Sequence, residues 1–575
     1  MSNAIETIIN NKIANVFEKL NLNAKFGFAK LSDRPDLSDF QCNGALALAK
    51  ELGKNPREIG QMIADELSQD ADFTKISVDG PGFVNMTLSN QFLENLINNT
   101  KEDEHYGVTK IEKPKKIILD FGGPNVAKEM HVGHLRTAVI GESIQRILRF
   151  IGNDVTSDVH LGDWGTQMGI VISEIIKKDG NLDKALSYNI DDIGAFYRAG
   201  NLRCKENLEE REIAKQILVK LHNGDELYRK VWRHLVDKSV EAIKENYKAL
   251  DINFDLWLGE SDAHEVCKDI VEIATQKGIS EIDEGANVIK LPEGNKPKPP
   301  VMLQKSDGGF TYHTTDIATI KMRVDSLNAQ EIIYITDFRQ GLHFEQVFEA
   351  SQILKIADNV DFKHIGYGTV NGQDGKPFKT RDGGVMNLET LLKISFDKVF
   401  ESMPEPTQEY NAEYISNLAQ QISIAGIKFQ DLKNNASSGY VFDLDDFAKF
   451  EGKTGPYIQY AIARINSILR KVNFASGNIV ITNPEERKLI LKLLNLNAIV
   501  YRAKDELEPS IIADYAFGLA QEFSSFYASS SIANEENKEI AASRLSLAKL
   551  TAEVLTLLLN LLGIESPEIM LKKAD

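Results

Sequence analysis

The first hundred residues alternate between helical and extended hydrophobic patterns. Apolar residues between positions 5 and 20 recur at intervals of three and four, which predicts an amphipathic helix. Asn55 followed by Pro56 predicts the capped start of another helix, because proline fits the first helical position. Two β-rich runs at 76–78 and 83–88, joined by a Gly-Pro-Gly turn, predict a pair of strands. We therefore expect a small α+β module.

A different pattern begins at residue 116. The apolar run 116–121 is followed by a Gly-Gly-Pro turn and then by helical periodicity from 131 to 151. Strand, glycine-rich turn and helix in this order are typical of the opening of a parallel nucleotide-binding sheet. Further strands are expected at 154–158, 331–335 and 362–367. The turn 307–309 predicts a hairpin between residues 304 and 312.

Helical periodicity dominates the other segments. The charged stretch from about 173 to 250 is expected to be a helical insertion into the parallel-sheet domain, and strand signals almost vanish after residue 388. The fold class is therefore expected to be multidomain α/β, with a Rossmann-like domain between an α+β module and an all-α domain. The expected boundaries are 1–110 for the α+β module with its linker, 111–390 for the Rossmann-like domain, 391–450 for connecting helices and 451–575 for the all-α domain.

Composition and charge narrow the class of protein. The 575 residues are 42% hydrophobic and 26% charged, which is typical of globular chains. The formal net charge is −18, so a nucleic-acid partner would have to meet a local positive patch. The three cysteines lie far apart, which argues against a disulfide framework and a thiolate zinc site. No secretory signal is visible and the most apolar stretch, 554–562, is short for a bilayer, so we expect a cytoplasmic protein without a membrane partner.

Two histidines mark the expected start of the helix that follows the first parallel strand. His131 and His134 are three apart and should share one face of a helix N-terminus, where free backbone N–H groups attract anions. Gly133 between them lets a base or ribose approach the backbone. The pair can also be read as half of a metal site or as a helix cap. The preceding strand and glycine turn favour nucleotide binding.

A second cluster of cations lies between glycines. Lys376, Lys379 and Arg381 can stabilise the negative charge that develops when a triphosphate reacts. Taken alone, such a cluster could also be a solvent-exposed basic hairpin without a role in phosphate binding. Its occurrence together with the histidine pair favours a functional role.

These motifs resemble the signatures of class I aminoacyl-tRNA synthetases. His131-Val132-Gly133-His134 resembles the first signature, and Lys376-Pro377-Phe378-Lys379-Thr380 resembles a variant of the lysine loop. Within that class the chain is similar to the arginyl-tRNA synthetase family. The segments that carry this similarity are 124–128 (PNVAK), 160–167 (HLGDWGTQ), 312–316 (YHTTD) and 453–461 (KTGPYIQYA). The resemblance extends over nearly the whole chain.

The resemblance implies an arginine–tRNA ligase. Such an enzyme forms arginyl-adenylate and pyrophosphate from L-arginine and ATP, and then transfers arginine to the 3′-terminal ribose of its tRNA. It implies Mg²⁺ with the ATP, no metal bound by protein ligands, and a monomer. It assigns the N-terminal module to the outer corner of the tRNA and the C-terminal helices to the anticodon.

The resemblance also implies roles for individual residues. The residues implied in catalysis are Lys128, His131, His134, Lys376 and Lys379, and those implied in ATP binding are Pro124, His131, Gly133, His134 and Lys379. Pro377 and Phe378 replace the usual pair between the two lysines of the loop. This departure leaves the division of work between Lys128 and Lys379 open.

A guanidinium has five donors in a planar fork and therefore requires carboxylates. Asp316, one helical turn beyond Tyr312, is our first candidate to hold it, with Tyr312 packing alongside. By resemblance, Glu260 is a second carboxylate, and Asn125 and Gln340 hold the α-amino and carboxylate end. A surface position or a helix cap is the alternative for each of them.

RNA-binding residues are expected in the C-terminal helices. Tyr457 and Tyr460 offer stacking surfaces and Arg464 a phosphate contact. Phe526 is a further candidate, although core packing is the commoner explanation for its aromatic cluster. A small-molecule nucleotidylyltransferase and a non-catalytic RNA-binding paralogue are the rival functions. The long helical C-terminal part argues against the first, and the presence of both histidines and the lysines argues against the second.

Overall fold

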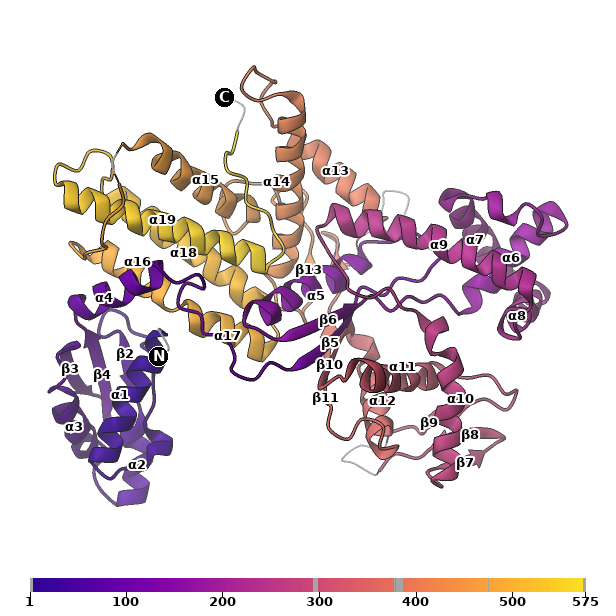
Figure 1. Cartoon of the computed structure of the whole chain (residues 1–575), viewed down its shortest axis with the longest axis horizontal. Coiled ribbons are helices and arrows are strands. Elements are labelled where there is room, and N and C mark those ends of the chain that lie inside the picture. The colour runs from indigo at the N-terminus through magenta and orange to yellow at the C-terminus, as the bar shows by residue number, and fades with distance from the viewer. Residues whose placement is uncertain (1–3, 293–297, 377, 379–385, 474, 572–575) are drawn as a thin grey trace.

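The computed structural model describes residues 4–292, 298–376, 378, 386–473 and 475–571 (Figure 1). The elements of the N-terminal module are α1 (Ile5–Lys19), β1 (Ala29–Leu31), β2 (Phe40–Cys42), α2 (Gly44–Leu52), α3 (Pro56–Leu67), β3 (Phe73–Asp79), β4 (Phe83–Leu88) and α4 (Asn90–Lys101). Its four strands form an antiparallel sheet in the order β1-β2-β4-β3. Asn55 caps α3 by accepting a hydrogen bond from the Arg57 N–H. The α+β module expected from the sequence is confirmed.

A parallel sheet forms the centre of the molecule. The elements around it are β5 (Lys116–Phe121), α5 (Gly133–Phe150), β6 (Asp154–Asp158), α6 (Thr166–Asp179), α7 (Ile190–Glu206), α8 (Leu208–His222), α9 (Glu226–Ala249), α10 (Glu260–Gln276), β7 (Ser280–Asp283), β8 (Ala286–Ile289), β9 (Val301–Gln304), α11 (Tyr312–Leu327), β10 (Glu331–Asp337), α12 (Gly341–Ile353), β11 (Asp361–Tyr367) and β12 (Val370–Asn371). The strand order is β11-β10-β5-β6, and all neighbours run parallel. The four strands expected in a parallel sheet are therefore confirmed.

The two faces of this sheet belong to two different cores. Ile117, Leu119 and Phe121 of β5 share a hydrophobic cluster with α5, whereas Ile118 belongs to a second cluster with α10, α11 and α12. Successive side chains of a strand point to opposite faces, so both faces of the sheet are covered by helices. This explains why the two central strands, β5 and β10, appear as continuous apolar runs in the sequence, whereas β6 and β11 are more polar.

The order in which strands are added to the sheet reverses between β5 and β10, although all four strands run parallel. From β5 the chain continues through α5 to β6 on one side, and from β10 it continues through α12 to β11 on the other. In open parallel sheets, ligands bind beyond the carboxyl ends of the strands at this kind of switch point. Phe121 and Asp337 end the two strands concerned. A ligand-binding site is therefore expected among the residues that follow these two strands.

Two expectations within this region need adjustment. The helical insertion begins at Thr166, seven residues before the expected start near 173, and comprises α6 to α9. The turn 307–309 is followed by a single bridge between Gln304 and Phe310 and not by a second hairpin strand, because α11 begins at Tyr312.

The described residues after 386 are predominantly helical, as expected. The elements are α13 (Leu388–Phe400), α14 (Ala412–Leu432), β13 (Tyr440–Val441), α15 (Gly455–Lys471), α16 (Pro484–Leu494), α17 (Leu496–Glu506), α18 (Ser510–Ser529) and α19 (Lys538–Leu561). The short strand β13 was not expected. It pairs in parallel with β12, and two residues are too few to give an alternating pattern. Among the described helices, none has the length and apolar content needed to cross a bilayer.

The helical C-terminal part packs against both other parts of the chain (Figure 1). Arg487 of α16 donates two hydrogen bonds to the carboxylate of Asp39 in the N-terminal module, at 2.8 and 2.7 Å. Ser143 and Arg146 of α5 donate to the backbone carbonyls of Leu561 and Asn560, at 2.8 and 3.2 Å. The helix that starts at the histidine motif is therefore held from behind by the end of α19.

Candidate functional site

The two histidines lie side by side at the switch point. His131 comes two residues before α5, and His134 is the second residue of that helix. Their rings stack with centroids 4.0 Å apart and an interplanar angle of 29°. The sequence interpretation that both share one face of a helix start is confirmed. A Cβ at position 133 would come within 2.8 Å of the His131 ring, so glycine is the residue that leaves room for this arrangement.

Backbone hydrogen bonds fix the tautomer of each histidine. His134 Nδ1 accepts the N–H of His131, and His131 Nδ1 accepts the N–H of Gly133, both at 3.1 Å. A neutral imidazole with an accepting Nδ1 carries its proton on Nε2. Burial and the nearby charges of His131 and Lys128 lower the pKa of His134 to about 3, and burial and Lys128 lower the pKa of His131. At neutral pH the pair is uncharged and has two Nε2–H donors.

The loop before the histidines is held in a specific conformation. Ala127 has a positive φ of 61°, a backbone conformation that costs energy for a residue with a side chain. Its N–H donates to Ser239 Oγ at 2.9 Å. Glu129 accepts hydrogen bonds from Arg198 of the helical insertion and from Asn387. The exposed Lys128 thus lies between two anchored neighbours.

The segment that carries the lysines is attached to the histidine motif. Val132 donates to the carbonyl of Met386 at 2.9 Å, and Leu388 donates to the carbonyl of Met130 at 3.0 Å. At its other end, Phe378 donates to the carbonyl of Val370 in β12 at 3.0 Å. Met386 in turn donates to the carbonyl of Phe378 at 3.3 Å. The end of the segment at Met386 therefore lies next to the histidine motif, and Phe378 is bonded to that end. Lys376 is described and exposed, whereas Lys379 and Arg381 lie outside the described residues.

Three candidate residues for the arginine side chain come together at the starts of two helices. Glu260 is the first residue of α10, Tyr312 is the first residue of α11, and Asp316 lies one turn further along α11. Burial, together with repulsion from Asp316 and Asp163, raises the pKa of Glu260 to about 7. Partial burial and the charges of Glu260 and Asp316 raise the pKa of Tyr312. These three side chains are close enough to act on one another electrostatically, with Tyr312 67% exposed, and we refer to them as the acidic pocket. The charge of the two carboxylates matches that of a guanidinium.

The two candidates for the amino-acid end lie at the switch point. Asn125 is exposed in the loop after β5 and forms a one-residue parallel bridge with Gly162. A Cβ at Gly162 would overlap the amide oxygen of Asn125, so glycine lets the Asn125 side chain keep its present position. Gln340 is exposed at the end of the turn that follows β10. Because β5 and β10 are neighbours, the loops that carry both residues leave the same edge of the sheet.

A buried charge cluster next to this pocket was missed by the sequence analysis. Arg323 of α11 donates from one nitrogen to both Asp120 and Asp158, at 2.6 and 2.7 Å. Burial alone would lower the pKa of His160, but the carboxylates of Asp158 and Asp120 raise it to about 9. The carboxylates stand on adjacent strands and Arg323 is far away in sequence. Only the position of the two aspartates near the ends of apolar strands could have suggested the cluster.

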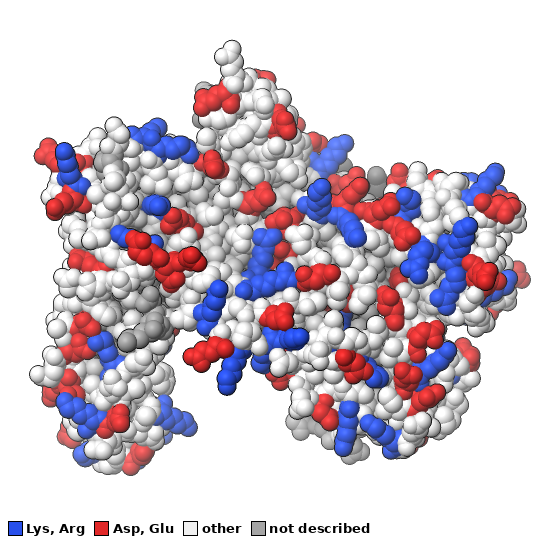
Figure 2. Space-filling model, viewed as in Figure 1, with Lys and Arg blue, Asp and Glu red and all other residues white. Residues whose placement is uncertain are grey.

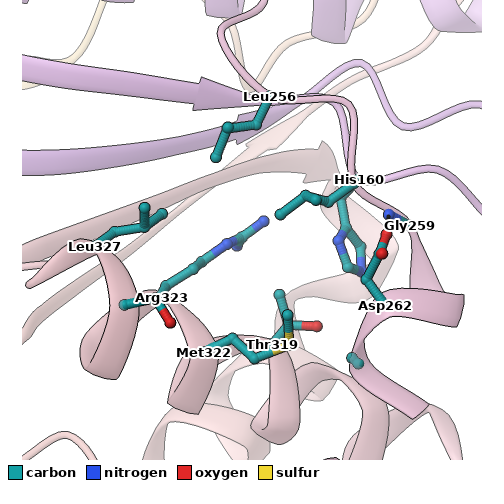
Figure 3. Close-up of a pocket in the computed structure, with 11 residues that line it drawn as sticks. His160, Leu256, Gly259, Asp262, Thr319, Met322, Arg323 and Leu327 are labelled. Carbon is teal, nitrogen blue, oxygen red and sulfur yellow. Dashed lines mark hydrogen bonds between the residues drawn. The ribbon is translucent and has the colours of Figure 1, made fainter. Parts of the chain in front are cut away.

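Figure 3 shows Arg323 reaching toward His160 across a cavity that Leu256, Met322 and Leu327 also line. The cavity has a volume of about 140 Å³ and includes Gly259, the residue before Glu260. The ligand atoms of Asp120, Asp158 and His160 lie within 4.8 Å of one another, as in a metal site. The guanidinium of Arg323 already links the two carboxylates, so this donor set does not suit a divalent cation.

The candidate RNA contacts differ in exposure. Tyr460 of α15 is 46% exposed, whereas Tyr457 packs against Phe517 with ring centroids 5.4 Å apart. Arg464 lies over the ring of Tyr527 at 4.6 Å. Phe526 is fully buried. It is therefore a core residue and offers no ring face to a base, which corrects its assignment as a contact.

Charges of both signs are mixed over the face of the molecule in Figure 2, despite the acidic total. Lys and Arg side chains gather in the centre of this view, over α5 and the strands β5 and β6. A local positive patch is what the sequence analysis required of an RNA-binding protein with this net charge.

Known proteins resemble the chain over its whole length. Residues 95–444 match the family model "tRNA synthetases class I (R), catalytic domain", residues 458–570 match "DALR anticodon binding domain" and residues 3–88 match "Arginyl tRNA synthetase N terminal domain". A protein of Hyphomonas neptunium named arginine–tRNA ligase is 42% identical, with 96% of this chain and 98% of the relative covered. A protein of Agathobacter rectalis with the same name is 40% identical, with 98% and 99% covered.

Solved structures agree with these matches. The arginyl-tRNA synthetase of Plasmodium falciparum has a TM-score of 0.84 at 26% identity, with 99% of this chain and 100% of that chain covered. The Thermus thermophilus arginyl-tRNA synthetase has a TM-score of 0.78 at 22% identity, with 98% and 100% covered, which is a likeness of fold.

Proposed function

Because the chain belongs to the arginyl-tRNA synthetase family of class I, we propose how its residues divide the work of charging tRNA with arginine. The chain is an aminoacyl-tRNA ligase that uses ATP. In the first step an oxygen of the arginine carboxylate bonds to the α-phosphorus of ATP, and pyrophosphate leaves. In the second step a ribose hydroxyl of the tRNA attacks the arginyl carbonyl, and AMP leaves.

The histidine pair and the lysines act on the triphosphate. His131 and His134 donate from Nε2 to phosphate oxygens as negative charge shifts toward the leaving pyrophosphate. Their neutrality supports this role, because a neutral donor stabilises developing charge without binding the ground-state triphosphate too tightly. Lys128, Lys376 and Lys379 supply positive charge to the same oxygens. Pro124 and Gly133 form the backbone surface on which the nucleotide lies.

The acidic pocket selects arginine. Glu260 and Asp316 accept the N–H groups of the guanidinium, and Tyr312 covers its plane. Asn125 and Gln340 hold the α-amino and carboxylate groups. This assignment is supported by the mutual electrostatic effects of Glu260, Tyr312 and Asp316. A neutral side chain of similar shape would leave largely buried carboxylates without a cationic partner from the substrate, which is costly.

Mg²⁺ enters with the phosphates of ATP. The one described cluster with the spacing of a metal site is linked by Arg323, so we assign no protein ligands to the ion. When bound, Mg²⁺ supplies positive charge to the triphosphate oxygens.

The other parts of the chain bind tRNA. Residues 1–110 contact its outer corner, residues 111–390 carry out the two chemical steps, and residues 391–450 connect this domain to the C-terminal helices. Residues 451–575 bind the anticodon. The side chains that contact the RNA there include Tyr460 and the exposed parts of Tyr457 and Arg464. The match of residues 458–570 to an anticodon-binding model supports the last assignment. From the resemblance to the family we propose a monomer, working in the cytoplasm where tRNA is charged for translation.

The observation that carries this function is the full-length similarity to arginine–tRNA ligases. The stacked histidine pair and the mutual influence of Glu260 and Asp316 support it. The test is to incubate the protein with ATP and total tRNA and offer each of the twenty amino acids in turn. Charging with arginine alone is the expected result. Charging with another amino acid, or with none, would contradict the proposal.

A further inference from the structure

One oxygen of Asp316 is already engaged before any substrate arrives. His343, the third residue of α12, places Nε2 at 2.5 Å from Asp316 Oδ2. The carboxylate can only accept, so His343 donates. Both side chains are about three-quarters buried, with exposed fractions of 25% and 21%. The hydrogen bond is therefore largely shielded from solvent.

The ring of His343 is itself fixed by its neighbours. It packs on His313 with centroids 4.7 Å apart and meets the edge of Phe344 at 5.3 Å. His313 Nε2 approaches Gln346 Oε1 at 3.4 Å, and Gln346 donates to the carbonyl of Pro299 at 2.8 Å. His313 and Asp316 are one turn apart on α11, and His343 and Gln346 are one turn apart on α12. The contacts thus join the two helices and hold the donor in one orientation.

This hydrogen bond changes how Asp316 can bind a guanidinium. A free carboxylate can accept a guanidinium fork with both oxygens. The bond to His343 uses one lone pair of Oδ2 and fixes the direction of the carboxylate, so Oδ1 is the oxygen with both lone pairs available. The second acceptor for the planar fork is then Glu260, the other carboxylate of the pocket.

We propose that His343 is a positioning residue for arginine specificity, which orients Asp316 so that the guanidinium bridges Asp316 Oδ1 and Glu260. This inference rests on the proposed function of the pocket. Two carboxylates in fixed positions match a rigid planar fork, whereas a lysine ammonium is a compact point charge on a flexible stem. His343 makes no contact with substrate in this arrangement and acts only through Asp316.

The test compares two exchanges at position 343. His343→Phe keeps an aromatic ring but removes the donor, and His343→Gln keeps an N–H donor. We expect His343→Phe to raise the KM for arginine in the charging reaction by about tenfold or more, since a hydrogen bond to a charged group is lost. The KM for ATP should stay within about twofold, and His343→Gln should recover part of the loss. A purely structural role would not separate the two KM values.

Two controls make the result decisive. His364→Phe replaces a nearby histidine that stacks on Phe344 and contacts Thr336 with its Nε2, and it should leave both KM values unchanged. In an Asp316→Asn background, His343→Phe should have little further effect, because no carboxylate remains to be oriented. An unchanged arginine KM in His343→Phe, or equal rises for arginine and ATP, overturns the inference. Failure of the unaltered chain to charge arginine would instead overturn the proposed function.

Discussion

Replacing Glu260 by glutamine should stabilise the protein and weaken arginine binding at the same time. The side chain is largely buried beside two other carboxylates, and its pKa is raised from 4.5 to about 7. An acid whose pKa is raised by folding destabilises the folded state as pH rises through this interval, and the full cost is present above pH 7. Glu260→Gln removes this cost because glutamine has no charge to desolvate.

The size of both effects follows from the same pKa. A shift from 4.5 to about 7 corresponds to about 3 kcal/mol, which is the upper limit of the stabilisation at pH 8. Little stabilisation should remain at pH 5, where Glu260 is mostly protonated in the folded state. The ionised carboxylate is the form that binds a guanidinium. With a pKa of about 7, Glu260 is ionised in about a tenth of the molecules at pH 6 and in about nine-tenths at pH 8. The Kd for arginine should therefore fall by roughly tenfold between these values.

The assays are thermal melting and equilibrium dialysis of labelled arginine, for the unaltered chain and for Glu260→Gln, from pH 5 to pH 8. We expect the melting temperature of the variant to exceed that of the unaltered chain at pH 8 and to approach it at pH 5. We expect the variant to bind arginine weakly and without the tenfold dependence on pH. Arginine binding that does not change between pH 6 and pH 8, or a variant that keeps the same dependence, would refute the reasoning.

Three further predictions concern the other groups of the site. Asp316→Asn should raise the KM for arginine by roughly tenfold to a hundredfold in steady-state charging, with little effect on the KM for ATP, because the hydrogen bonds it loses reach a charged group; equal effects on both would count against its role. Lys379→Ala should slow adenylate formation in single-turnover experiments while tRNA affinity stays nearly constant, and an unchanged rate would contradict this. Family resemblance predicts that pyrophosphate exchange into ATP requires tRNA as well as arginine, so exchange without RNA would set this chain apart.

Local patterns predicted much of the fold. The apolar run of β5 and the glycine turn after it fixed the position of the parallel sheet, since a strand covered on both faces is apolar throughout. The spacing of His131 and His134 predicted their common face, because residues three apart are neighbours on a helix. Asp316 and Tyr312 were placed on one helix for the same reason.

The parts that were missed depend on contacts between distant segments. Arg323 meets Asp120 across 203 residues, and nothing near either position in the sequence reveals the other. His343 meets Asp316 only because α11 and α12 pack together. The burial of Phe526 follows from the packing of α18 in the helical bundle, which helical spacing alone does not show.

The attachment of α5 to the end of α19 has a consequence for synthesis of the protein. Ser143, in the helix that begins at the histidines, donates its hydroxyl hydrogen to a carbonyl 418 residues further along the chain. When the ribosome has synthesised the chain only as far as the last strand of the parallel sheet, α19 does not yet exist. The side of α5 that carries Ser143 is then still uncovered. The catalytic centre therefore gains its final support only after the last long helix has been translated, so truncated translation products should be inactive even when they contain every residue that touches substrate.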